Sequence, residues 1–152
     1  MIQRIQTLYL LAIALLMGVA TFTPLAYFVA GSEEYLLHAF SLKSATSSHS
    51  TIYMGIIVAL AAIIPFVTIF LYKNRLLQIR LCAVEFVLLI GSVIFMAIYY
   101  YLGNRFFSDI AFHTQGFRIA IIFPLISLIL NYLAMRGIFK DEMLVKSLNR
   151  IR

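Results

Sequence analysis

The chain has 152 residues, of which 63% are hydrophobic and only 12% are charged. Soluble domains carry roughly 25% charged residues, so this composition excludes an ordinary soluble protein and indicates an integral membrane protein. The formal net charge of +6 does not indicate nucleic-acid binding, because no folded basic domain is present to hold a duplex.

Four apolar segments predict membrane-spanning helices, since a helix of about 20 residues crosses a hydrocarbon core of about 30 Å. We place them at about residues 8–30, 52–72, 81–102 and 117–139, with a tail at 140–152. The predicted fold class is all-α, an antiparallel four-helix transmembrane bundle with a short cytoplasmic C-terminal amphipathic helix. No repeat or linker divides the sequence, so residues 1–152 are expected to form a single domain.

The first segment resembles a secretory signal, because the basic residue Arg4 precedes an apolar run. A signal has an apolar region of about 7–15 residues, and this run is longer, so we expect it to be retained as a span. Pro24, Pro65 and Pro124 fall within the first, second and fourth spans. We interpret them as kinks that shape the bundle.

The connections between the spans are short and uneven. The outer loop at 31–51 begins with "EYLLHAFSL", which is typical of a short strand or of a segment lying at the membrane interface. Its second half is rich in Ser and Thr and indicates a flexible segment. The other outer loop, "GNRFFSDIAFHTQG", carries aromatic residues suited to dip back toward the membrane. The inner loop at 73–80 is short enough to make the second and third spans antiparallel neighbours.

The distribution of Lys and Arg predicts the orientation. Four spans place both termini on one side, together with the 73–80 loop, and that side carries most of the basic residues. They are Arg4, Lys73, Arg75, Arg80, Arg136, Lys140, Lys146, Arg150 and Arg152, whereas the other side has only Lys43, Arg105 and Arg118. The positive-inside rule therefore places both termini in the cytoplasm.

Motifs for catalysis or metal binding are absent from the sequence. The single cysteine, Cys82, excludes a disulfide framework, and its expected role is packing. His38, His49 and His113 lie on the outer side, with Asp109 four residues before His113, but their spacing is unspecific for a metal. We expect no catalytic residue, no metal site and no cofactor, and we favour a non-enzymatic role over an enzymatic one.

Glu85 is an acidic residue within the predicted span 81–102, where an ionised carboxylate has a high free-energy cost in hydrocarbon. It lies five residues past Arg80, or about 7 Å along a helix axis. Counting five residues outward from Arg4, Lys73 and Arg136 gives a predicted buried polar layer. Its members are Tyr9, Thr68, Glu85 and Asn131.

Two interpretations of this layer remain open. In the structural one, Glu85 is neutral and donates a hydrogen bond to Asn131 or Tyr9, which fixes the helix register. In the functional one, Glu85 exchanges protons or binds a cation on a transport path. We favour the structural interpretation because transporters usually place several charges or broken helices around a midplane cavity.

The tail "KDEMLVKSLNRIR" predicts a short amphipathic helix, with Leu144, Leu148 and Ile151 at helical spacing and Gly137 as a bend before it. Glu142 precedes Lys146 by four residues, a spacing that supports a helix. The tail either rests on anionic lipid headgroups at the cytoplasmic face or docks a partner protein. The expected contact residues are Arg4, Lys140, Lys146, Arg150 and Arg152.

The opening "MIQRIQTLYLL" and the closing "KDEMLVKSLNRIR", with four spans between them, resemble the bacterial membrane proteins of domain of unknown function family 4293, found in the Bacteroidota. The resemblance covers the whole chain and is most specific at its two ends. It implies a four-helix protein of the bacterial inner (cytoplasmic) membrane and supplies no activity, cofactor or catalytic residue. The matching positions are Met1, Gln3, Arg4, Gln6, Lys140, Asp141, Glu142, Lys146, Ser147, Arg150 and Arg152.

Two hypotheses for function follow. The preferred one is a non-enzymatic accessory or scaffold subunit that contacts a partner membrane protein through its cytoplasmic face. The alternative is a small transporter or a lipid-active protein that works through Glu85 and Asn131.

Overall fold

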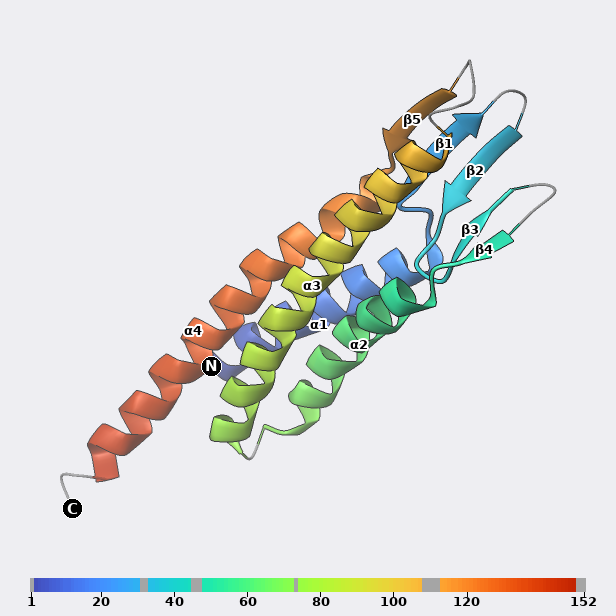
Figure 1. The fold of residues 1–152 in the computed structure, drawn as a ribbon. Helices are drawn as coiled ribbons and strands as arrows, with labels where there is room; N and C mark the ends of the chain where they lie inside the picture. The colour runs from blue at the N-terminus through green and yellow to red at the C-terminus, as the bar shows by residue number, and fades with distance from the viewer. Residues whose placement is uncertain (1, 31–32, 45–47, 73, 108–112, 150–152) are drawn as a thin grey trace.

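The computed structural model describes residues 2–30, 33–44, 48–72, 74–107 and 113–149. For residues 2–4, 107, 113, 148 and 149 the description covers the backbone alone. Four long helices lie side by side and a small sheet lies beyond one end of them (Figure 1). We call this end the sheet end and the opposite one the terminal end, because the chain begins and finishes there.

The four helices are α1 (Ile2–Phe22), α2 (Ile52–Phe70), α3 (Arg75–Phe107) and α4 (Phe123–Asn149). Each is long and apolar enough to cross a membrane, judged by length and composition. This confirms the prediction of four apolar helices. α1 and α3 each pack against both α2 and α4, so the helices form a four-membered ring of neighbours.

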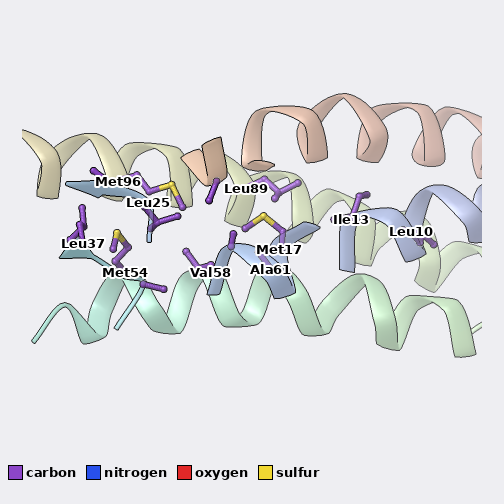
Figure 2. Packing of buried hydrophobic residues seen from close by; sticks show 14 of the residues in the cluster. Leu10, Ile13, Met17, Leu25, Leu37, Met54, Val58, Ala61, Leu89 and Met96 are labelled. Carbon is purple, nitrogen blue, oxygen red and sulfur yellow. The ribbon is translucent and has the colours of Figure 1, made fainter. Parts of the chain in front are cut away.

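The buried positions of every helix follow one spacing, alternating steps of three and four residues. On α2 they are Met54, Val58, Ala61, Pro65 and Thr68, with Gly55 buried beside Met54, and on α4 they are Pro124, Ser127, Asn131, Ala134 and Ile138. This heptad spacing lets antiparallel helices interdigitate along their whole length. Figure 2 shows Met17, Val58 and Leu89 meeting between the helices, and Leu25 and Leu37 extend the same core to the sheet end.

The outward faces of the helices carry many large apolar side chains, and the inward faces include several polar ones. Leu15, Val87 and Ile129 are 62%, 68% and 65% exposed, whereas Thr68, Glu85, Ser92, Ser127 and Asn131 are buried. The helices of a soluble bundle usually carry charged and polar residues on their outward faces instead.

The sheet is the element that the sequence prediction missed. Its strands are β1 (Ala26–Ala30), β2 (Glu33–Leu37), β3 (Ser41–Lys43), β4 (Ser48–Ser50) and β5 (His113–Phe117). They form an antiparallel sheet in the order β4-β3-β2-β1-β5. The prediction of an all-α fold was therefore incomplete.

The first span was placed too far along the chain. α1 ends at Phe22, and Pro24, which lacks an N–H for a helix or sheet bond, separates it from β1. Ala26, Phe28 and Ala30 of β1 are buried against the bundle. The Phe28 ring approaches α3 so closely that a Cβ at Gly103 would lie 2.6 Å from it. β1 is apolar because it packs against the bundle, so in the sequence it resembles a continuation of the first predicted span.

The outer loops also differ from expectation. The strand interpretation of "EYLLHAFSL" is confirmed by β2 and β3. The half predicted to be flexible contributes β4, while its residues 45–47 lie outside the described part of the chain. In the second outer loop α3 continues to Phe107 and β5 takes residues 113–117, including the predicted start of the fourth span.

Two further expectations about the helices were wrong. Of the three prolines, Pro24 follows α1 and Pro124 lies in the first turn of α4, so only Pro65 has the mid-helix position expected of a kink. The tail is no separate helix, because α4 runs without interruption from Phe123 to Asn149. Gly137 does not end it. A Cβ there would lie 3.0 Å from the Gln6 side chain, so Gly137 admits α1 to close contact.

Candidate functional site

Glu85 lies on the inward face of α3, at heptad spacing with Cys82, Leu89 and Ser92. Its side chain is 1% exposed, and neither carboxyl oxygen has a hydrogen-bond partner among the residues that the structure describes. A buried ionised group without a partner costs far more free energy than a buried neutral one. The site therefore favours a neutral carboxyl group or a bound positive charge.

Asn131 faces Glu85's helix from α4. Its Nδ2 donates a hydrogen bond to the carbonyl oxygen of Cys82 at 2.9 Å, and the residue is 1% exposed. α3 and α4 are neighbours that run in opposite directions. Moving three residues forward from Cys82 on α3 therefore corresponds to moving three or four residues back from Asn131 on α4. Glu85 is consequently level with Ser127, one turn from Asn131.

Ser127 is fully buried, and within the described ranges its Oγ and the Oδ1 of Asn131 have no hydrogen-bond partner. The α3–α4 contact thus holds four buried oxygen atoms without partners: both carboxyl oxygens of Glu85, Ser127 Oγ and Asn131 Oδ1. Each unsatisfied buried polar group costs about 1–3 kcal/mol. We call Glu85, Ser127 and Asn131 the polar layer.

The predicted members of the layer are only partly brought together. Glu85 and Asn131 lie on adjacent helices, but the expected hydrogen bond from Glu85 to Asn131 or Tyr9 is not formed in the described structure. Thr68 lies nearer the terminal end, because its carbonyl oxygen accepts a hydrogen bond from Gln78 Nε2 at 3.0 Å, and Gln78 precedes Glu85 by about two helical turns. Thr68 Oγ1 donates to the carbonyl of Ile64. Tyr9 is half-buried on α1 and packs against the apolar core.

Sequence reasoning missed Ser127, and also Gln78 and Ser92 on the buried face of α3. Heptad spacing is the signal that finds them. Steps of three and four from Glu85 reach Gln78, Cys82 and Ser92, and one step of four back from Asn131 reaches Ser127.

A second polar cluster closes the terminal end. Gln6 Nε2 of α1 donates to Asp141 Oδ2 of α4 at 2.9 Å, and Arg75 Nη1 of α3 donates to the Asp141 carbonyl oxygen at 3.3 Å. We call Gln6, Arg75 and Asp141 the terminal clamp. It joins α1, α3 and α4, because the Gln6 and Arg75 side chains each donate a hydrogen bond to Asp141.

Beyond the clamp, α4 extends past the start of α1 (Figure 1). Met143, Leu144 and Val145 are exposed on this extension. Lys146 pairs with Glu142 at 3.4 Å, as their spacing predicts. A groove of about 660 Å³ lies between the extension and the turn joining α2 to α3, with Asn74, Arg75, Leu76 and Val145 among its lining residues.

The structure describes the side chains of only some of the predicted contact residues. Lys140 and Lys146 are exposed on α4. Arg4 is described by its backbone alone, and Arg150 and Arg152 lie outside the described residues.

Cavities and metal-binding groups do not coincide with the polar layer. Its residues line none of the three main pockets. Across the described ranges no three His, Cys, Asp or Glu side chains gather in a way that would hold a metal ion. His49 packs edge-on against Phe106. The predicted metal candidate Asp109 lies outside those ranges, as does the His113 side chain.

The comparisons with known proteins agree with the resemblance seen at the two ends of the sequence. No curated protein matches the chain. The family model described as "Domain of unknown function (DUF4293)" matches residues 2–151, and the chain belongs to that family.

Proposed function

We propose that the protein spans the bacterial inner membrane four times, with both termini in the cytoplasm, and acts there as a non-enzymatic accessory subunit of a membrane-protein complex. The lengths and compositions of the four helices support the membrane location, and the apolar outward faces suit contact with lipid. The excess of basic residues near the termini supports the orientation.

The α4 extension is the observation that carries the accessory role. The terminal clamp fixes the base of the extension to α1 and α3. Above that base, Met143, Leu144 and Val145 are exposed on a helix whose position is already set, so docking costs little ordering entropy. Exposed apolar side chains on a helix end of fixed position are suited to a groove on a partner.

Crosslinking tests this role. A photoreactive amino acid at Leu144 in cells should give a discrete adduct with one membrane protein. The same group at Tyr53, an exposed aromatic residue at the sheet end, is the matched control and should give none. Adducts with lipid alone at Leu144 would instead show an interfacial helix, and recovery of an unmodified monomer would contradict the docking role.

Cysteine labelling tests the orientation. The chain has one cysteine and Cys82 is buried, so the background reactivity is low. In intact spheroplasts a membrane-impermeant maleimide should label Ser48→Cys and spare Ser147→Cys. Labelling of both would show that the helices do not span the membrane as proposed.

A second candidate function is a small transporter or lipid-active protein, and the unpartnered oxygens of the polar layer favour it. A carboxyl, a hydroxyl and an amide oxygen together suit a proton or a small cation. The Glu85→Gln variant separates the two functions. Loss of activity in cells at unchanged protein level and thermal stability would favour transport, whereas full activity would leave Glu85 a structural group.

A further inference from the structure

The polar layer has no direct hydrogen bond between its own side chains. Both carboxyl oxygens of Glu85, Ser127 Oγ and Asn131 Oδ1 lack partners among the described residues, and all three residues are buried. A serine hydroxyl can donate to a carboxylate, and so can an asparagine amide. Ser127 makes no such bond, and the amide of Asn131 donates to Cys82 instead. A bridge between these groups therefore needs a further atom between them.

Within the described part of the chain, no basic side chain balances the charge of Glu85. The other buried polar residues there are glutamines, threonines, serines and Asn131, and none of them carries a charge. The ion pairs Arg118–Glu34 and Lys146–Glu142 lie at the two ends of the molecule. A buried carboxylate without a compensating charge has a high free-energy cost. The compensating charge therefore has to come from outside the chain, as a proton or as a bound cation.

A metal cation suits the four oxygens better than a proton does. A protonated carboxyl group has one hydrogen to donate and satisfies one acceptor, whereas a cation between the side chains coordinates all four oxygens at once. Hard cations take oxygen ligands of these kinds. The layer has one carboxylate, so a monovalent ion leaves the site neutral and a divalent ion leaves a buried positive charge. A space of about one water molecule holds such an ion, so no large cavity is required.

We propose that Glu85, Ser127 and Asn131 bind one monovalent metal cation, with sodium as its probe. Both carboxyl oxygens of Glu85, Ser127 Oγ and Asn131 Oδ1 are the ligands. The hydrogen bond from Asn131 Nδ2 to the Cys82 carbonyl oxygen holds the amide in place and leaves Oδ1 for the ion. The bound ion joins α3 to α4. The inference rests on the polar layer of the second candidate function and requires neither transport nor the docking role of α4.

Thermal unfolding of the full-length protein in detergent tests the site, with sodium chloride replacing choline chloride at constant ionic strength. In choline the oxygens of the layer remain without partners, which is the baseline state. We expect Tm to rise with sodium concentration and then to level off, because an ion that binds the folded state stabilises it. Glu85→Gln removes the charge at nearly unchanged volume and should abolish the rise. The matched control, Glu142→Gln, removes an acidic charge outside the layer and should keep it.

Direct binding of radioactive sodium keeps the test independent of stability. The wild type should bind one sodium ion per chain, and Ser127→Ala, which lacks one ligand, should bind it several-fold more weakly. No binding by the wild type, or undiminished binding by Glu85→Gln, would overturn the proposal. So would an equal loss of the Tm response in Glu85→Gln and Glu142→Gln. Sodium binding without sodium transport in vesicles would support the site and contradict the second candidate function, so the two failures are distinguishable.

Discussion

The same bundle holds two polar clusters of opposite character. In the terminal clamp, the Gln6 amide and the Arg75 guanidinium each have an acceptor on Asp141. In the polar layer, four oxygen atoms of Glu85, Ser127 and Asn131 have no partner in the described structure. Satisfied buried groups hold helices together, whereas unsatisfied ones cost free energy and mark a site kept for another reason. The comparison therefore assigns a structural role to the clamp and a candidate functional role to the layer.

Replacing Glu85 by an apolar residue should produce the largest effect. The Glu85→Met variant removes two unpartnered oxygens and keeps the side-chain volume, so we expect an increase of about 1–4 kcal/mol in the free energy of unfolding. Unfolding in mixed detergent micelles, followed by circular dichroism, measures it. A clear loss of stability would show that the carboxyl group is satisfied in the native protein and that the contrast with the clamp is false.

Breaking the clamp should act in the opposite direction. Asp141→Ala leaves the buried Gln6 amide without its acceptor, and we expect a loss of about 1–3 kcal/mol in the same unfolding assay. Glu142→Ala is the matched control, because it removes only the i,i+4 pair with the exposed Lys146 and should cost less than about 1 kcal/mol. Equal losses in the two variants would show that the clamp does not hold the helices.

Within the polar layer, the partnered and unpartnered atoms should also behave differently. Asn131→Leu removes the hydrogen bond to Cys82 and should cost about 0.5–1.5 kcal/mol. Ser127→Ala removes an oxygen without a partner, and we expect no measurable loss of stability. A loss in Ser127→Ala as large as that in Asn131→Leu would mean that Ser127 forms a hydrogen bond in the native protein.

The smallest expected effect is a loss of stability at acid pH, caused by His38 at the sheet end. Burial and the nearby charge of Lys43 lower the pKa of His38 below its ordinary value of 6.5. The folded protein therefore binds the proton less readily than the unfolded chain. Stability is fully present above about pH 6.5 and declines as the pH falls below it. Thermal unfolding of the wild type between pH 7.5 and 5 should show this decline. The His38→Gln variant should show less of it, and an identical pH response in the two proteins would assign the decline to another group.

The sequence allowed the helices to be predicted, but not the sheet. Long apolar runs such as that of α2 predict a long apolar helix by length and composition alone. β1 escaped notice because its inward residues, Ala26 and Phe28, face the bundle and are as apolar as a helix in lipid. β4 and β5 are short and polar. β4 pairs with the neighbouring strand β3, whereas β5 pairs with β1, which is distant in the sequence.

The sequence also predicted only part of the candidate site, because the rest depends on the register between helices. Glu85 and Asn131 stand out as polar residues within apolar spans, and both prove to be buried. Counting from basic residues did not find Ser127 and placed Thr68 too near Glu85, because basic residues at helix ends do not mark equal depths. The contact from Asn131 to Cys82 sets the register, and no property of either helix alone reveals it.

By itself, the sequence determined that the chain has four apolar helices, that most of its basic residues lie near the termini or in the 73–80 connection, and that an acid lies among apolar residues. These properties depend on composition and on local spacing along the chain. Only the tertiary structure decided which described atoms of the polar layer are left without partners, how Asp141 joins three helices, and that Phe117 of β5 stacks on Tyr100 of α3. Each of these depends on the register between segments far apart in the sequence, and side-chain packing fixes that register only when the whole chain has folded.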